Sequence, residues 1–142
     1  MQRPLIHALA VFALMMAAPA VAEDRARLDV KVEVEAPTGQ VMIALYDSEA
    51  AFDAGGQPVR AVMVDVASGA RSVSLEGLKP GTYAFKAFHD VNGNGRMDTN
   101  PFGMPIEPFA FSNNAVGNMG PAKWDRAHFD ISGTTAQSVT LT

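Results

Sequence analysis

Apolar residues in this chain recur at every second position over long stretches, and this period limits the fold more than any other feature. Over residues 28–35, leucine and valine alternate with aspartate, lysine and glutamate. Successive side chains of a β-strand point to opposite faces, so the alternation predicts a strand with one buried and one solvated face. Residues 41–46 form a more continuous apolar run, which indicates a strand in a central position.

Seven strands are predicted in all, with a single helical turn at 49–52 and no strong amphipathic helix. They cover residues 28–34, 41–46, 59–66, 71–75 and 81–89, with a sixth marked by Ala127, Phe129 and Ile131 and a seventh by Val139 and Leu141. Turn signals separate most of them. The pattern predicts an all-β fold: an antiparallel, seven-stranded, immunoglobulin/prealbumin-like β-sandwich with one long ordered loop.

The turn before the fifth strand supports the same fold class. Its pattern is Leu78-x-Pro80-Gly81-x-Tyr83. Proline presets the backbone of a turn and glycine accepts a positive φ. The pattern resembles a turn of prealbumin-like and carboxypeptidase-regulatory-like sandwiches, in which a tyrosine near the start of the strand anchors the turn by a hydrogen bond.

The amino-terminal segment predicts export. Arg3 precedes an uncharged apolar run at residues 5–18, and Ala20-Val21-Ala22 forms a small-x-small cleavage site. This order is typical of a secretory signal peptide. The run is shorter than the roughly 20 residues that span a membrane. We therefore predict a signal peptide at 1–22, a single domain at 23–142 in the periplasm or the medium, and no stable membrane span after cleavage.

Charge and cysteine content narrow the class of protein. The formal net charge is −4 and no basic patch stands out, which disfavours binding to nucleic acid. The chain has no cysteine, so an exported domain of this kind depends on its apolar core, on a metal ion, or on both.

One loop carries the spacing of a calcium site. Residues 90–95 fit D-x-[DN]-x-[DN]-G, the first half of a calcium loop. Calcium binds several oxygen ligands, and alternate positions in a kinked loop turn their oxygens to one centre. The predicted ligands are the side chains of Asp90, Asn92, Asn94 and Asp98, the carbonyl of Arg96 and, from outside the loop, Glu107.

The rest of an EF-hand is missing. Pro101 stands where the bidentate glutamate belongs, and no helical pattern flanks the loop. Asp47 and Asp125 are further candidates for the missing oxygen. With so few carboxylates the affinity should be weak, about 10⁻⁴–10⁻³ M. The alternative is a metal-free loop, because aspartate, asparagine and glycine also form tight turns on their own.

The connection from 99 to 125 shows no clear period. It holds too many large apolar residues for a solvated linker, and its prolines stiffen it, so an ordered loop is expected. One interpretation is a binding surface made of Phe109, Phe111, Asn113, Asn114 and Trp124. The other, which we favour, is a lid that completes the core, since exposed aromatic residues on this scale promote aggregation.

Two long motifs carry a resemblance to a known family. They are the run from Gly81-Thr82-Tyr83 through His89-Asp90-x-Asn92-Gly93-Asn94-Gly95-x-x-Asp98-Thr99-Asn100, and the run Gly103-x-Pro105-x-Glu107-Pro108-x-x-Phe111-Ser112-Asn113-Asn114. Together they resemble the DUF2141 family of bacterial exported proteins of unknown function, from about Leu28 to Leu141. The resemblance implies a small exported β-sandwich and no established activity. Ala110 departs from the family pattern, in which glycine is usual.

These observations predict a non-enzymatic module of the cell envelope, stabilised by calcium, with a binding or structural role and an envelope protein or glycan as partner. The alternative is a small periplasmic enzyme that uses His89, Asp90 and Glu107 in a cleft. The sequence holds no nucleophile motif of the G-x-S-x-G or H-E-x-x-H type, and we assign no catalytic residue. A third alternative is a structural or transport-associated accessory protein without a ligand.

Overall fold

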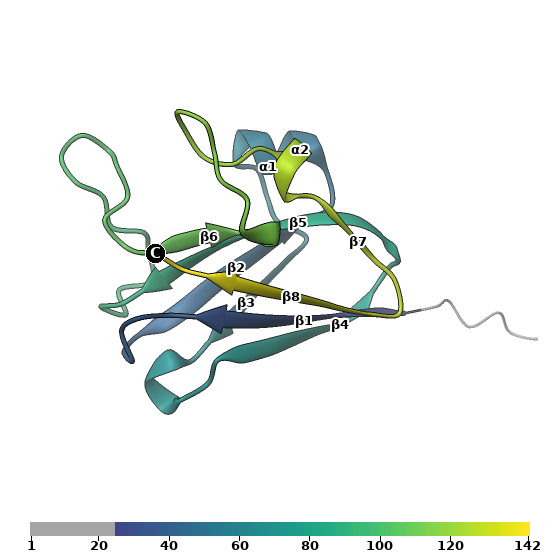
Figure 1. Ribbon diagram of the computed structural model, residues 1–142, viewed down its shortest axis with the longest axis horizontal. Helices are drawn as coiled ribbons and strands as arrows, with labels where there is room; N and C mark the ends of the chain where they lie inside the picture. Colours follow the sequence, from purple (N-terminus) through teal and green to yellow (C-terminus); the bar gives the residue numbers. More distant parts are fainter. Residues whose placement is uncertain (1–24) are drawn as a thin grey trace, which may run out of the picture.

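The structure is a computed structural model that describes residues 25–142. The predicted signal peptide, 1–22, lies outside the described residues. The strands and helices, labelled in Figure 1, are β1 (Ala26–Glu33), β2 (Gln40–Tyr46), α1 (Glu49–Ala54), β3 (Arg60–Val64), the 3₁₀ turn η1 (Val66–Ser68), β4 (Ser72–Leu78), β5 (Gly81–Asp90), β6 (Phe109–Phe111), the 3₁₀ turn η2 (Ser112–Asn114), α2 (Trp124–Ala127), β7 (Phe129–Ile131) and β8 (Thr134–Thr140).

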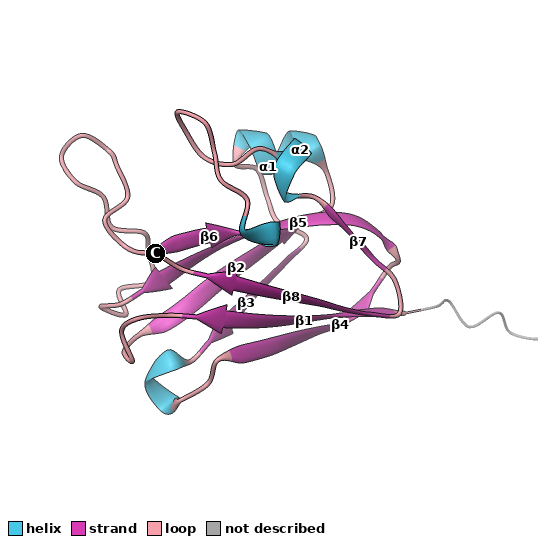
Figure 2. Ribbon diagram, viewed as in Figure 1, coloured by secondary structure: helices cyan, strands magenta, loops and turns pink. Residues whose placement is uncertain are grey.

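The strands form two sheets, and α1 and α2 lie side by side on the outside of one of them (Figure 2). One sheet has the order β4-β1-β8, and the other has the order β3-β2-β5-β6, with β7 paired to the start of β5. The predicted all-β sandwich is confirmed. The structure adds an eighth strand, β6, inside the long connection. It also pairs β1 with β8 in parallel, whereas every other pair is antiparallel, as predicted. The immunoglobulin-like topology stays a prediction.

Alternation along the strands builds the core between the two sheets. Leu28, Val30 and Val32 of β1 are fully buried and face the second sheet, where Val41, Ile43 and Leu45 of β2 are buried in the same way. Burial of such side chains contributes about 1.5–3 kcal/mol each relative to exposure. The predicted period of two therefore decides which face of each sheet is inside.

The predicted anchor of the turn before β5 is confirmed. The hydroxyl of Tyr83 donates a hydrogen bond to the carbonyl of Lys79 over 2.7 Å. Burial raises the pKa of Tyr83 above its usual value, and the nearby charge of Asp47 adds to the rise. The bond fixes the entry of the chain into β5, the strand that leads to the Asp90 loop.

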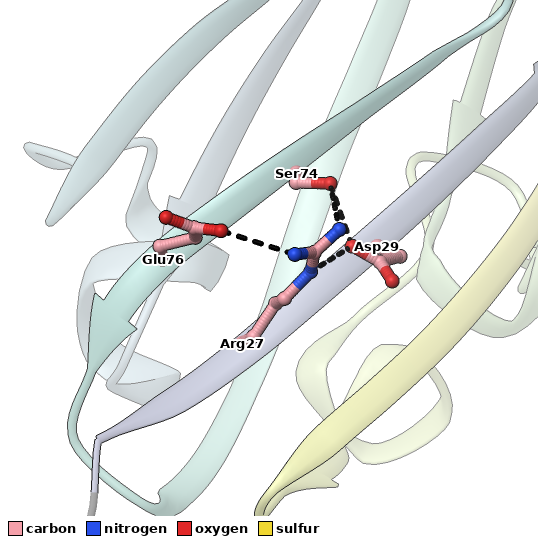
Figure 3. Close-up of polar contacts among 4 residues, drawn as sticks. All are labelled: Arg27, Asp29, Ser74 and Glu76. Carbon is pink, nitrogen blue, oxygen red and sulfur yellow. Dashed lines mark hydrogen bonds and ion pairs between the residues drawn. The ribbon is translucent and has the colours of Figure 1, made fainter.

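The outer face of the three-stranded sheet is polar. Figure 3 shows Arg27 of β1 bound to Asp29 on the same strand and to Ser74 and Glu76 on β4. The hydrogen bonds from Ser74 and Arg27 lower the pKa of Asp29. A polar outer face is the ordinary condition of a sandwich whose sheet meets water.

The outer face of the five-stranded sheet differs, because it is apolar. At one end α1 and α2 cover it, and a second small core forms there. Phe52 of α1 meets Tyr46, Phe111 and Trp124 edge-on, with ring centroids 5.6, 6.3 and 6.0 Å apart. The other end of this face is left without a helix. Within residues 25–142, no helix has the length and hydropathy of a membrane span.

Candidate functional site

The Asp90 loop begins where β5 ends, and the turn between β1 and β2 holds its base. The ring nitrogen Nε2 of His89 lies 2.7 Å from the carbonyl oxygen of Thr38, and the Thr38 hydroxyl donates to the carbonyl of Val91 over 3.2 Å. Gly39 approaches so closely that a Cβ there would lie 1.9 Å from the Asp90 carbonyl oxygen. Two separate turns are thus packed backbone to backbone at this end of the sandwich.

Asp90 is fully buried and acts as the internal acceptor of the loop. Its Oδ1 accepts the backbone N–H of Asn94 over 3.1 Å, and its Oδ2 accepts the N–H of Gly95 over 2.8 Å and the side-chain amide of Gln40 over 3.1 Å. These bonds satisfy the carboxylate and close the loop. Asp90, which was predicted as the first metal ligand, therefore accepts hydrogen bonds that hold the loop together in this structure.

Four of the other predicted ligands converge on one spot. The amide Nδ2 atoms of Asn92 and Asn94 lie 2.6 and 2.7 Å from the two carboxylate oxygens of Asp98. The Glu107 carboxylate lies beside them and accepts the N–H of Asp98 over 3.3 Å. The donated bonds, from Asn94 first and then from Asn92, lower the pKa of Asp98. The sequence predicted that these residues share one site, and metal binding there stays a prediction.

The amide oxygens point away from that spot. Asn92 Oδ1 accepts the N–H of Asn94 over 3.3 Å, and Asn94 Oδ1 accepts the N–H of Arg96 over 3.1 Å. These are the turns expected of a metal-free loop. A half-turn of each side-chain amide exchanges its nitrogen and oxygen. Both oxygens would then face Asp98, an arrangement that needs a cation between them.

Three further facts bear on a metal. Among residues 25–142, no group of three or more histidine, aspartate and glutamate side chains is arranged to hold an ion, so an ion here depends on amide and backbone oxygens as well. Asp47 follows Tyr46, which pairs with Ala84 at the other end of β5, about 20 Å from Asp90. Asp125 lies in α2, which packs with α1 near that same end. Neither supplies the missing oxygen.

His89 and His128 lie apart. His89 is fully buried; Nε2 meets the carbonyl of Thr38, and Nδ1 is without a hydrogen-bond partner in the described part of the chain. His128 caps α2 and stacks on Trp124 with ring centroids 6.0 Å apart. Between residues 25 and 142, no hydrogen bond joins His89 to Asp90 or Glu107. The enzyme alternative stays a prediction.

The residues predicted as a binding surface divide into two kinds. Asn113 and Asn114 adopt positive φ, and their amides donate to backbone carbonyls of neighbouring segments. Phe111 and Trp124 pack in the small outer core. Phe109 is 40% exposed. The asparagines thus stabilise the fold, and among the three aromatic residues only Phe109 presents a largely open face.

The long connection does not form a simple lid. Its first part, 97–108, is a hydrogen-bonded loop in which Thr99 bridges to Pro105 and the Asn100 side chain caps the turn. The large apolar residues near its tip are exposed, Phe102 to 89%. A second loop, 115–121, stands on the same side of the sheet (Figure 1). The expectation that all of these residues complete the core is wrong for both loop tips.

A groove of about 1200 Å³ lies between these two loops on the uncovered end of the five-stranded sheet. The strands and both loops line it, with apolar groups over most of the surface. The lining includes Met42, Ala44, Ala61, Lys86, Phe88 and Met104. The sequence did not reveal this groove. The sequence signal that could have indicated an apolar outer face was the continuous apolar run of β2, in which both faces of the strand are apolar.

Comparison with curated proteins and with solved structures gives no match. A family comparison does. The sequence model of the family described as "Uncharacterized protein conserved in bacteria (DUF2141)" matches residues 30–140, so the predicted resemblance is confirmed and the chain belongs to that family.

Proposed function

We propose that the mature chain is a non-catalytic binding module of the bacterial cell envelope, and that it takes an apolar ligand in the groove between loops 97–108 and 115–121. A calcium-type loop at 90–98 stabilises one wall of this groove. The ligand is apolar rather than a glycan, because the lining offers mainly carbon atoms and few hydrogen-bond partners.

The contrast between the two outer faces carries this proposal. The β1–β4 face presents charged and hydroxyl groups, whereas the other sheet presents Met42, Met63 and Phe88 on its outer side. Met63 is 51% exposed. Soluble monomers seldom leave a large contiguous apolar patch open to water, and those that do commonly use it for binding. A concave apolar patch bounded by ordered loops is the usual form of a ligand site.

Calcium would act on the wall rather than on the ligand. Glu107 is buried, belongs to the carboxyl end of loop 97–108 and meets Asp98 at its amino end. An ion bound by Asp98, Glu107 and the rotated amides of Asn92 and Asn94 would hold both ends of the loop. The proposed site therefore couples the Asp90 loop to the groove.

The groove is tested with a neutral apolar dye whose emission rises on burial. Ala61 is an exposed groove position on β3, and Ala61→Phe should fill the space beside it. The control is Ser72→Phe, which places the same ring on the polar face of the other sheet. We expect saturable dye binding that Ala61→Phe reduces at least tenfold and Ser72→Phe leaves unchanged. Equal binding by all three proteins would place the dye elsewhere and overturn the proposal.

The metal is tested separately by thermal unfolding with calcium and with chelator. Ligand at ten times its dissociation constant stabilises a protein by about 1.4 kcal/mol. We expect millimolar calcium to raise the melting temperature of the wild type and of Asp125→Asn, which lies at the other end of β5, and not that of Glu107→Gln. If the wild type has the same melting temperature with calcium and with chelator, the calcium site is refuted, and the proposal of a ligand groove still stands.

A further inference from the structure

We propose that the groove binds a single-chain amphiphile with a carboxylate head, such as a free long-chain fatty acid, and that Lys86 receives the head while the chain lies over Phe88 and Met42. This inference rests on the proposed function of the groove and adds the ligand class and its orientation. Its basis is the register of the outer face, the surroundings of the Lys86 ammonium and the room beside it.

The strand register arranges the groove floor in two rows. In one row, Ala61 of β3, Ala44 of β2, Lys86 of β5 and Phe111 of β6 lie opposite one another in turn. Lys86 is the one charged side chain in the groove lining formed by residues 25–142. The two alanines beside it leave room on one side, so a head group has space next to the ammonium.

The second row lies about 7 Å further along the strands. Met42, Phe88 and Phe109 form it within the groove, and Met63, the partner of Met42 on β3, continues it outside the groove lining. All four are large and apolar. Beyond this row, Met97 and Met104 of loop 97–108 line the groove. The floor is therefore polarised, with one cation and small residues at one end and thioether and aromatic surface at the other.

The ammonium of Lys86 has no carboxylate partner within the described chain. Its Nζ donates to the carbonyl of Phe52 over 2.6 Å and stands 4.7 and 5.1 Å from the ring centroids of Phe52 and Tyr46. Burial lowers the pKa of Lys86. The negative charge of Asp53 offsets part of this decrease, and the positive charge of Lys123 adds to it. An ammonium has three donors. A ligand carboxylate would satisfy the remaining donors and compensate a partly desolvated charge.

The remaining surroundings agree with an anionic head and an uncharged chain. No aspartate or glutamate side chain lines the groove among the residues described, and Thr142, whose main-chain oxygen accepts the N–H of Phe109, lies by the apolar row and not beside Lys86. A volume of about 1200 Å³ exceeds what a short carboxylate fills and is somewhat larger than most small-molecule pockets, which hold about 300–1,000 Å³. The methionines suit a flexible chain, since thioethers adapt to irregular apolar shapes.

The test uses the mature chain with saturated carboxylates of eight, ten and twelve carbons and the matching primary alcohols, below their micelle-forming concentrations. Trp124 is the only tryptophan, and it packs on Phe52, whose carbonyl accepts a hydrogen bond from the Lys86 ammonium. The emission of Trp124 should therefore change when a head group binds Lys86, and calorimetry gives the affinities. Each added methylene should raise affinity about fourfold in both series. At equal chain length, the carboxylate should bind at least tenfold more tightly than the alcohol.

Substitutions at Lys86 separate the head group from the chain. Lys86→Met keeps an apolar stem, so it should retain alcohol binding and lose the preference for the carboxylate. Lys86→Arg should restore the preference, and Lys31→Met, on the opposite sheet, should leave it unchanged. Melting curves establish that each variant is folded.

Each other outcome has one meaning. If alcohols and carboxylates bind equally, or if Lys86→Met keeps the preference, the groove function stands and the head-group assignment is wrong. If alkyltrimethylammonium binds more tightly than the carboxylate, the assignment is also wrong. If the protein associates only with anionic lipid vesicles or only with an apolar peptide, the site is a docking surface and not an amphiphile site. Absence of binding in both series overturns the proposed function together with this inference.

Discussion

Gly39 joins the turn after β1 to the backbone of the Asp90 loop. Its φ is +66°, a region that costs other residues about 1–2 kcal/mol, and a side chain there would collide with the carbonyl of Asp90. Gly55, the C-cap of α1, has a similar φ of +67° but open space around it. A substitution at Gly55 therefore measures the cost of the positive φ alone, and one at Gly39 measures that cost together with the cost of the steric clash.

We therefore expect Gly39→Ala to lower the free energy of unfolding by more than about 3 kcal/mol, and Gly55→Ala by about 1 kcal/mol. Urea unfolding of the two variants measures both values. Similar losses in the two proteins would mean that the turn yields easily and does not support the loop.

Asp98 makes the stability depend on pH in a defined direction. Its pKa is lowered in the folded protein by the amides of Asn94 and Asn92. A lowered folded pKa contributes stability that is fully present above the unfolded value, about 3.9, and is lost as the pH falls through the folded pKa. The carboxylate is exposed enough that the effect is modest.

The matching experiment compares the melting temperatures of the wild type and Asp98→Asn in chelator as a function of pH. The wild type should melt higher from pH 7 down to about pH 4, and the gap should close below that value. Asp125→Asn provides the control. A gap that widens on acidification would show that Asp98 is not held as an acceptor by the two asparagines.

At the scale of elements, one buried serine connects three segments. Ser112 follows β6, and its Oγ accepts the N–H of Phe85 over 3.0 Å and donates to the carbonyl of Ala127 over 2.6 Å. Phe85 lies between the part of β5 that pairs with β7 and the part that pairs with β6. The hydroxyl thus satisfies a backbone group in the gap between the two pairings.

Ser112→Ala should lower the free energy of unfolding by about 1–3 kcal/mol, because it leaves a buried N–H and a buried carbonyl without partners. Ser138→Ala on the surface of β8 serves as the control and should change the stability by less than about 0.5 kcal/mol. Chemical unfolding checks both. Equal stability of Ser112→Ala and the wild type would mean that water replaces the hydroxyl.

Local patterns in the sequence predicted most strands, and tertiary pairing explains the rest. Alternation over 28–34 marks β1 because one face must be buried. β6 was not predicted because it has only three residues and forms only by pairing with the edge of β5. The parallel pairing of β1 with β8 leaves no local trace, since it joins the two ends of the domain.

The candidate site was predicted to a similar extent. The spacing of Asp90, Asn92 and Asn94 predicted side-chain oxygens gathered around an ion, whereas in the structure the amide nitrogens of Asn92 and Asn94 face Asp98. Metal binding by the loop stays a prediction. The spacing could not reveal that Asp90 turns inward, because its partner Gln40 lies fifty residues away in the chain. The groove could not be predicted either, since it depends on which outer face the helices leave uncovered.

At the scale of the whole molecule, the two sheets present opposite kinds of surface. One outer face is a charged network, and the other is an apolar floor closed at one end by α1 and α2 and flanked by two loops. The methionines follow this division. All five within residues 25–142 lie on the groove side: Met42, Met97 and Met104 line the groove, Met63 stands on the same outer face, and Met119 lies at a loop tip.

The most direct test of the apolar groove is therefore a methyl spectrum of the mature protein labelled at its methionine methyl groups and titrated with decanol, a ligand without charge. The account predicts saturable shifts of Met42, Met97 and Met104, with Met119, fully exposed at its loop tip, unmoved. Shifts confined to Met119, or no saturable shift at any methionine, would contradict it.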